Sequence, residues 1–423
     1  MERLRSHSPA LALAILTAIS TIGFVDRIVV NALVEPIKAE FELSDAQIGL
    51  LGFAYSVLNI LIGIFIARLA ERKRRMSLIA LGTLLWSFAA AACGYVQTWT
   101  QLLLGRVGVG VGEAVGLASN QSVIADYFRP ERRATAMSVL LLAPPLGAFI
   151  GLAGGGLIAQ AWGWRMAFVV TALPGFLLAV LAYLFVAEPE RGQYDPHASK
   201  DVPPIGAVLR RFAELPSARH LVAGSVLASF VGFGLNAFFA ALVMRRFGLP
   251  IAEAGLYAGL IASLPASISI VGGGALADRL AARIPSSYAL VPAISLAVAA
   301  PLFAFAITRS ELVPLLMLVG LSTLLQFTYL GMTFGTLQNM MHPRMRATAN
   351  AFLGIVFGFA GGFGPLMVGA ISDRFAADGI APGMALAWAM ACAAIIYWWS
   401  SAHYFLAARS VGADLARVRE GRI

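Results

Sequence analysis

Two short motifs occur once in each half of this chain, and they constrain its fold more than any other feature. LAER at residues 69–72 returns as LADR at residues 276–279, which is 207 positions later and close to half the chain length. RATA at residues 133–136 returns at residues 346–349, which is 213 positions later. Repeats on this scale indicate a duplication. The fold must therefore contain two related halves.

The composition places both halves in a lipid bilayer. Hydrophobic residues make up 59% of the chain, charged residues 13%, and the mean hydropathy is +0.80. A water-soluble domain of 423 residues would lack the polar side chains to cover its surface. The apolar segments each exceed the roughly 20 residues that a membrane-spanning helix needs, and they lack the alternation of a barrel strand. We predict an all-α integral membrane protein with twelve transmembrane helices in two pseudo-symmetric six-helix bundles. The predicted helices cover residues 9–33, 46–67, 76–96, 100–126, 135–161, 165–187, 219–243, 253–276, 287–308, 312–340, 348–373 and 384–407.

The segment between the sixth and seventh predicted helices separates the bundles. Residues 188–218 contain five prolines among charges of both signs and form a predicted cytosolic linker. Residues 205–215 could form a short amphipathic helix on the membrane surface or a plain connector. The predicted organisation is thus an N-terminal bundle at 1–187, the linker, and a C-terminal bundle at 219–423 that ends in a short cytosolic tail.

Basic residues are distributed unevenly between the two sets of loops. Of the 31 Lys and Arg residues, 23 lie in loops on the side that carries both termini, six lie on the opposite side, and two lie within apolar segments. Loops rich in Lys and Arg stay in the cytosol. We therefore predict a multi-pass protein of the plasma (inner) membrane with both termini cytosolic. The net charge of +9 then reflects orientation anchors and no nucleic-acid surface.

No pattern of residues indicates an enzyme, a metal site or a cofactor. The five histidines are scattered, and Cys93 and Cys392 lie in apolar segments of opposite halves, where we expect two buried thiols. The glycines at 108, 110 and 112 lie inside an apolar helix with no preceding strand, so they do not form a nucleotide-binding loop. No loop combines a nucleophile, a base and an orienting group.

Four ionisable residues lie within apolar segments, where charged groups are costly and are functional candidates. Asp26 and Arg27 belong to the first segment, and Arg106 and Glu113 to the fourth. Arg106 and Glu113 are seven residues apart and therefore lie nearly on one helix face. The four formal charges sum to zero, so protonation of one acid would leave +1 and link proton binding to the binding of a charged substrate. The alternative is a static salt-bridge network that fixes helix packing.

The repeated loop motifs predict a gate at the cytosolic end. Acids and bases in these loops could pair between bundles and hold one conformation closed. Solvated loops that only set orientation are the alternative. The predicted gate residues are Glu71, Arg72, Arg75, Asp278 and Arg279 from the first motif, with Arg133 and Arg346 from the second.

Small residues and prolines indicate how the fourth and fifth segments pack. Glycines recur at intervals of four residues at 108, 112 and 116, and again at 147, 151 and 155. Each set predicts a flat face for close helix packing. Pro144 and Pro145 must interrupt the hydrogen bonds of the fifth helix and are expected to kink it.

These motifs resemble the conserved positions of the major facilitator superfamily over essentially the whole chain. The resemblance rests on Arg75, Arg106 with Gly110, the motifs at 71–72 and 278–279, and the glycines of the fifth segment. The stretches DR at 26–27, EPIK at 35–38, LSDAQIGL at 43–50, GEA at 112–114 and DYF at 126–128 resemble the Spinster-type subfamily. That subfamily is associated with export of lysophospholipids and sphingoid phosphates. The resemblance implies a coupling and binding centre at Asp26, Arg27, Arg106 and Glu113.

The superfamily architecture implies further substrate-binding candidates. Its first, fourth, seventh and tenth helices line a central cavity, so polar residues of those segments become candidates, together with two from the second segment. These residues are Asn120, Asn236, Gln326, Tyr329, Tyr55 and Asn59. Ordinary hydrogen bonds between helices are the alternative for each of them.

The sequence therefore predicts a monomeric, proton-coupled secondary transporter of an amphipathic organic substrate with a polar or anionic head, working by alternating access. Asp26 is the expected proton carrier, Glu113 a second titrating acid, Arg106 an anion site, and Arg27 a partner of the acids. An exporter of small soluble metabolites or drugs is one alternative. A sensor, or a protein that translocates lipid without coupling, is an alternative of another class.

Overall fold

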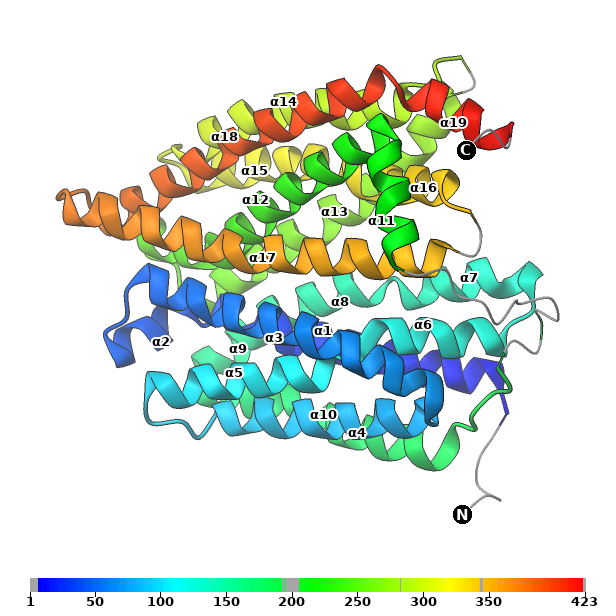
Figure 1. The fold of residues 1–423 in the computed structure, drawn as a ribbon. Coiled ribbons are helices and arrows are strands. Elements are labelled where there is room, and N and C mark those ends of the chain that lie inside the picture. Colours follow the sequence, from blue (N-terminus) through cyan, green and yellow to red (C-terminus); the bar gives the residue numbers. More distant parts are fainter. Residues whose placement is uncertain (1–6, 192–193, 195–204, 282, 343–344, 421–423) are drawn as a thin grey trace. The chain divides into compact units, whose positions relative to one another are not determined.

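The chain forms helices over most of its length in the computed structural model, which describes residues 7–191, 194, 205–281, 283–342 and 345–420 (Figure 1). Eleven helical stretches of the described residues are long and apolar enough to cross a membrane. The fourth of the twelve predicted segments is divided into two shorter helices. The helices up to residue 191 are α1 (Pro9–Ala32), α2 (Val34–Phe41), α3 (Asp45–Arg72), α4 (Arg75–Cys93), α5 (Trp99–Glu113), α6 (Gly116–Tyr127), α7 (Pro130–Leu140), α8 (Ala143–Phe149), the π-helix η2 (Ile150–Gly154), α9 (Gly155–Trp162) and α10 (Trp164–Phe185). Those that follow are α11 (Ile205–Glu214), α12 (Pro216–Phe247), α13 (Ile251–Ala281), α14 (Ser287–Ile307), α15 (Leu312–Gln326), α16 (Thr328–Met340), α17 (Arg346–Ala377), α18 (Pro382–Ala408) and α19 (Val411–Arg419).

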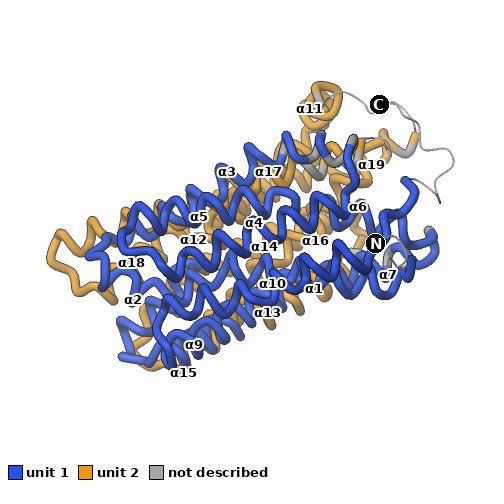
Figure 2. The backbone as a smooth tube through the Cα atoms, turned by 90° about the horizontal axis from the view of Figure 1, so that it is seen from below, with its two compact units in different colours: residues 1–198, 237–260 blue, residues 199–236, 261–423 orange. Residues whose placement is uncertain are grey.

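Two compact units share these helices (Figure 2). Unit 1 contains residues 1–198 together with 237–260, and unit 2 contains 199–236 together with 261–423. The boundaries cross two helices. The last residues of α12 and the first residues of α13 belong to unit 1, while the rest of both helices belongs to unit 2.

Within unit 1, α1 and α4 are the central packing elements. α4 lies along α5 and α10, and α1 contacts α10 as well as α8, η2 and α9 (Figure 1). The predicted glycine face on the fifth segment forms, because a Cβ atom at Gly151 would lie 3.0 Å from the backbone oxygen of Val25 on α1. The predicted interruption of this segment is also confirmed. α7 ends at Leu140, and α8 begins at Ala143 with Pro144 and Pro145 in its first turn, where their missing N–H groups cost least.

The fourth and tenth segments are each broken near their middle. α5 ends at Glu113 and α6 begins at Gly116, while α15 ends at Gln326 and α16 begins at Thr328. Glu113 and Gln326 are 213 positions apart, which is the offset of the second sequence repeat. A break within a transmembrane helix frees backbone groups that neighbouring helices must satisfy. The duplication thus places a functional candidate at the equivalent break in each half.

The glycine face predicted for the fourth segment extends over part of its length. A Cβ atom at Gly112 would lie 2.5 Å from the backbone nitrogen of Trp86 on α4, and one at Gly108 would lie 3.0 Å from Cβ of Ala89. Gly116 does not join this face, because a Cβ atom there meets nothing within 4 Å. The helix break after Glu113 turns Gly116 away from α4, so the predicted three-glycine face ends at Gly112.

Unit 2 repeats part of this packing. α14 lies along α15 and α18, and α17 lies along α18. A Cβ atom at Gly234 on α12 would lie 2.9 Å from the backbone oxygen of Gly364 on α17, so the fifth and first helices of this half also meet through glycine. Of the two alternatives that the sequence left open for residues 205–215, a short helix or a plain connector, the structure has the helix α11. It packs Phe212 on Phe352 of α17 with ring centroids 5.5 Å apart.

The expectation of two buried thiols is half correct. Cys93 on α4 is buried, but Cys392 on α18 is exposed. Ile395 and Trp399, which follow it on the same helix, are 53% and 62% exposed. A helix face that contacts lipid is as apolar as one that contacts protein, so hydropathy could not separate the two environments.

Candidate functional site

Arg106 connects α5 to the backbone of α1 in the interior of unit 1. Its side chain is among the largest fully buried ones, with 1% of the residue exposed. Nη1 donates to the backbone oxygen of Asp26 over 2.8 Å, and Nη2 donates to that of Arg27 over 3.2 Å. A buried guanidinium needs acceptors to offset its desolvation, and two carbonyls in the C-terminal third of α1 provide them. Arg106 thereby fixes the height of α5 against the Asp-Arg pair of α1.

Tyr55 on α3 joins the cations to the acid at the end of α5. Its hydroxyl donates to Oε2 of Glu113. The guanidinium carbons of Arg27 and Arg106 lie 5.3 and 5.4 Å from the centroid of its ring. Cations at this range are attracted by the ring's electrons. One aromatic side chain therefore contacts both arginines and one of the two acids.

Asp26 is the more deeply buried of the two acids of the site. The residue is 1% exposed, and neither carboxylate oxygen has a hydrogen-bond partner among the described residues. A negative charge on this carboxyl group is therefore costly, because burial removes it from water and no hydrogen bond from the described part of the chain replaces the lost hydration. The sequence predicted one site of Asp26, Arg27, Arg106 and Glu113. In the structure Tyr55 contacts Arg27, Arg106 and Glu113, while Asp26 is connected to Arg106 through its backbone oxygen. The site differs from a simple set of ion pairs, because Arg106 binds main-chain oxygens of α1.

The polar candidates of the first half make hydrogen bonds between helices. The amide nitrogen of Asn59 on α3 donates to the backbone oxygen of Gly110 over 3.0 Å. Asn120 on α6 is 1% exposed, and its amide nitrogen donates to the hydroxyl of Ser20 on α1 over 2.8 Å. These hydrogen bonds connect α3 to α5 and α6 to α1.

The candidates of the second half lie in unit 2. Asn236 is partly exposed on α12. Gln326, at the end of α15, accepts from the hydroxyl of Tyr397 over 2.9 Å and donates to the hydroxyl of Ser322 over 2.8 Å. Tyr329 is 5% exposed and contacts the ring of Tyr404 at a centroid distance of 6.4 Å. Gln326 and Tyr329 are thus built into the contact with α18.

The gate candidate Arg75 belongs to a network inside unit 1. It is 4% exposed at the start of α4. Its guanidinium donates to Asp126 over 2.5 Å, to Glu188 over 2.9 Å and to the hydroxyl of Ser122 over 2.9 Å. Glu188 also accepts from the backbone nitrogen of Met76 over 2.9 Å. Arg75 therefore ties α4 and α6 to the segment that follows α10.

The other gate candidates are more loosely defined. Arg279 is exposed near the end of α13, and Arg133 is partly exposed on α7. The side chains of Glu71, Arg72, Asp278 and Arg346 lie outside the described part of the structure. Within the described residues, no three His, Cys, Asp or Glu side chains are grouped in a way that could hold a metal ion.

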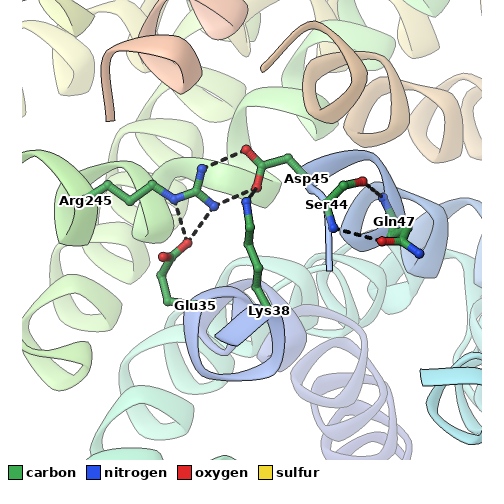
Figure 3. A network of polar contacts seen from close by, with 6 residues as sticks. All are labelled: Glu35, Lys38, Ser44, Asp45, Gln47 and Arg245. Atoms are coloured by element: carbon green, nitrogen blue, oxygen red, sulfur yellow. Dashed lines mark hydrogen bonds and ion pairs between the residues drawn. The ribbon is translucent and has the colours of Figure 1, made fainter. Parts of the chain in front are cut away.

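Sequence reasoning overlooked an ionic cluster of Glu35, Lys38, Asp45 and Arg245, which we name the α2 cluster (Figure 3). Three of these residues lie between the first and second predicted helices, and Arg245 lies 200 positions from Asp45. The available signal was four charged residues at the ends of predicted helices on one side of the membrane. Charges at helix ends are common, so this signal alone did not predict pairing.

The fold and the buried charges define a class: a multi-pass helical membrane protein with duplicated bundles and ionisable side chains inside one of them. The chain belongs to the Major Facilitator Superfamily, whose family model matches residues 15–365. It is 33% identical over 400 residues to an MFS-type efflux pump of Mycolicibacterium smegmatis, covering 93% of this chain and 92% of that protein. It is 26% identical over 390 residues to the sphingosine-1-phosphate transporter SPNS2 of Danio rerio, covering 88% of this chain and 77% of the relative.

A solved structure agrees with this relationship. A bacterial homologue of the human lysosomal transporter Spinster, in an inward-facing and unoccupied conformation, matches with a TM-score of 0.88 and 29% identity. The match covers 96% of this chain and 98% of that structure. The protein is therefore a Spinster-like membrane transporter of the superfamily and not an enzyme.

Proposed function

We propose that this protein is a proton-coupled secondary transporter of an amphipathic organic substrate with an anionic head, working by alternating access. The observation that carries the proposal is the group of Asp26, Arg27, Arg106 and Glu113 in unit 1, in which Tyr55 contacts the last three and Arg106 binds the backbone oxygens of Asp26 and Arg27. The formal charges of the four residues cancel. Protonation of one acid leaves an excess positive charge, which favours an anionic ligand. Substrate binding and proton binding thereby affect each other.

The two acids have different surroundings and therefore different proposed roles. Asp26 carries the proton, because its carboxylate oxygens lack hydrogen-bond partners among the described residues and its charged form is the least supported. Glu113 is the second titrating acid, and the Tyr55 hydroxyl supports its charged form. Arg27 is the counter-charge of the acids. Arg106 positions α1 through two of its donors and contributes positive charge to the anion site.

The relatives support a lipid-like substrate and leave a second candidate. The zebrafish relative is a sphingosine-1-phosphate transporter, which supports a single-chain amphiphile with a phosphate head. The mycobacterial relative is an efflux pump, which supports the export of small soluble drugs or metabolites. Thermal unfolding of the purified protein with sphingosine 1-phosphate, or with ethidium as a soluble drug, separates the two. We expect sphingosine 1-phosphate to raise the melting temperature more, and more strongly at the lower of two pH values.

The proposed setting is the plasma (inner) membrane, where the protein works as a monomer with both termini in the cytosol. The 23 basic residues on the side of the termini support this orientation. The end of unit 1 at which α1 ends and α3 begins then faces outward. The two halves alternate in exposing the site to the two sides, with residues 1–187 and 219–423 as the moving bundles. The predicted gate residues of the repeated loop motifs contribute to closing the cytosolic side.

Proteoliposomes loaded at one pH and diluted into another test the proposed coupling. The Asp26→Asn variant is expected to lose proton-driven accumulation of sphingosine 1-phosphate by at least about tenfold while still inserting and running as a monodisperse peak, because it cannot release a proton. Asp378→Asn is the matched control, since Asp378 is an exposed acid whose side chain is 50% accessible. Accumulation by Asp26→Asn that equals the control would reject the role of Asp26. A gradient that drives no accumulation in the wild-type protein would instead favour the sensor or the uncoupled translocator.

A further inference from the structure

The α2 cluster connects a distant arginine to three residues near the end of α1. Arg245 donates through Nη1 and Nη2 to the two carboxylate oxygens of Asp45, each over 2.7 Å, and through Nε to Glu35 over 2.8 Å (Figure 3). Lys38 contacts the same oxygen of Asp45 as Nη2 does, over 2.5 Å. The side chains of Asp45 and Arg245 are 3% and 8% exposed, whereas those of Glu35 and Lys38 are 25% and 28% exposed. The centre of the cluster is therefore a nearly buried, two-pronged ion pair.

Three members of the α2 cluster lie on α2 and at the start of α3, which together we name the platform. Glu35 and Lys38 are on α2, and Asp45 is the first residue of α3, next to a capping box formed by Ser44 and Gln47. α2 is itself held to α10, because Glu40 accepts from the indole of Trp164 over 2.7 Å and from Arg165 over 2.6 Å. A carboxylate at a helix N-terminus is further stabilised by the first turn's N–H groups. Lys38 and Asp45 thus remain together whatever Arg245 does.

Arg245, by contrast, belongs to a helical hairpin that both units share. Residues 237–260, which we name the hairpin tip, include the end of α12 and the start of α13 and cluster with unit 1 (Figure 2). The tip has a second attachment on α9, where the backbone nitrogen of Ala252 donates to Gln160 over 3.0 Å. A Cβ atom at Gly156 would lie 2.7 Å from the backbone oxygen of Ile251, so the helices touch there through glycine. The remaining parts of α12 and α13 belong to unit 2, so motion of unit 2 pulls on the tip.

We propose that Lys38 is a resident counter-ion that retains the charge of Asp45 when Arg245 withdraws, so that the hairpin tip is a reversible gate on the outward end of the protein. A nearly buried carboxylate left without a cation is strongly disfavoured. If Arg245 were the cation that Asp45 depended on, its withdrawal would leave the nearly buried Asp45 carboxylate without a counter-charge. With Lys38 in place, the platform retains a neutral Lys38–Asp45 pair, and the partly exposed Glu35 and the departing Arg245 become hydrated. Lys38 is thus a positioning residue for the transport cycle: it lowers the free energy of the open state.

This inference rests on the alternating access of the proposed function, but not on its proton coupling or its substrate. Loss of Arg245 and loss of Lys38 should therefore shift the balance between the open and closed states in opposite directions, although both cations contact the carboxylate of Asp45. Arg245→Met removes the contact that holds the tip closed and leaves the Lys38–Asp45 pair intact, which favours opening. Lys38→Met leaves the Arg245 contact intact and strands Asp45 on opening, which favours closure. A cluster that merely supports the fold would respond to both losses in the same direction.

Pulsed electron spin resonance measures the distance between the loop that joins α4 to α5 in unit 1 and the hairpin tip. Spin labels are attached at Gln97→Cys and Glu253→Cys, both exposed, in a background carrying Cys93→Ala and Cys392→Ala. We expect Arg245→Met to raise the ratio of long to short distances by about fivefold or more, and Lys38→Met to lower it by a similar factor, as for couplings between distinct sites. Lys38→Arg should restore the wild-type ratio, because it keeps the charge at Asp45.

Two further variants guard against a failure to fold. Arg245→Lys keeps one charge but loses the two-pronged geometry, and it should give a ratio between those of the wild type and Arg245→Met. Arg309→Met serves as the matched control, because Arg309 follows α14 and contacts only the last turn of that helix in these interactions, through the ring and the backbone oxygen of Phe305. Equal ratios for Lys38→Met and the wild type, or shifts of the same sign in both cation variants, would overturn the proposal. If the variants shift the distance ratios as expected but a proton gradient drives no accumulation in the wild-type protein, the result counts against the proposed coupling alone.

Discussion

At the scale of single residues, the sequence identified the ionisable candidates but not their partners. Asp26, Arg27, Arg106 and Glu113 were recognisable because charges inside apolar segments are rare. The partners depend on which neighbouring helix each side chain reaches. Arg106 could have paired with an acid, yet it binds two carbonyls of α1, and Glu113 is bonded by Tyr55, which is 58 positions away. Periodicity within one helix contains no information on such contacts.

The Tyr55 hydroxyl is therefore expected to stabilise the fold as well as the site. Tyr55→Phe keeps the ring that contacts both guanidinium groups but removes the hydrogen bond to Glu113. The loss of a hydrogen bond to a buried charged acceptor costs about 1.5–3 kcal/mol. Thermal unfolding in detergent should show a lower melting temperature for this variant. Tyr95→Phe is the control, since Tyr95 is 75% exposed, and an equal decrease in both variants would contradict this reading of Tyr55.

At the scale of elements, sequence patterns located the helices and one break, and tertiary contacts decided the rest. The prolines at 144 and 145 predicted the interruption before α8, because a missing N–H group has a local effect. The breaks after Glu113 and Gln326 have no proline, and neither was predicted. The sequence predicted no helix at α2, although this helix holds two residues of the α2 cluster. These features depend on contacts made by distant segments.

The contact between α5 and α3 depends on the absence of a side chain at Gly110. A Cβ atom there would lie 2.6 Å from the backbone oxygen of Tyr55, so Gly110→Ala forces the helices apart. We expect it to destabilise the protein by about 1–3 kcal/mol, as for other overpacked positions. Gly116→Ala is the matched control, because nothing lies within 4 Å of its Cβ position, and alanine in a helix should be neutral or stabilising by about 0.5–1 kcal/mol. Urea or thermal unfolding compares the pair, and a tolerated Gly110→Ala would argue against close packing here.

The attachment of α2 to α10 is expected to weaken in acid. Its hydrogen bond from Arg165 holds the pKa of Glu40 below the ordinary value of 4.5. A lowered pKa in the folded state means that the contact stabilises the protein above pH 4.5 and loses this effect as the pH falls through the lowered value. Glu40→Gln should lower the melting temperature slightly at pH 7, in line with about 0.2–1 kcal/mol for a partly exposed pair. The difference from the wild type should shrink toward pH 4, and a difference that is constant with pH would exclude this contribution.

At the scale of the whole molecule, the duplication predicted two halves with the same helices, and the family match confirms that fold. The chemistry of the halves is not duplicated. The first half has Glu113 at its broken helix, bonded by Tyr55 of α3, while the second has Gln326 at the equivalent position, bonded by Tyr397 of α18. The first half also has Asp26, Arg27 and Arg106 within its apolar segments, and at the offset of 213 these correspond to Phe239, Ala240 and Val319 in the second half. The sequence could show this asymmetry in residue type, but the change of partner helix required the structure.

This asymmetry predicts that the response of transport to pH depends on the first half. Glu113→Gln makes the first half resemble the second, and its amide oxygen still accepts the hydrogen bond from Tyr55, so the variant is expected to fold. It removes one of the two titrating acids and leaves Asp26, so its transport of sphingosine 1-phosphate into proteoliposomes should vary less between about pH 5.5 and 8 than that of the wild type. Gln326→Leu is the comparison in the second half. It leaves the Tyr397 hydroxyl without its acceptor at a cost of about 1–3 kcal/mol in stability, while the pH profile keeps its wild-type slope. A wild-type profile for Glu113→Gln would show that Glu113 takes no part in the response to pH, and a flattened profile for Gln326→Leu would show that this response is not confined to the N-terminal bundle.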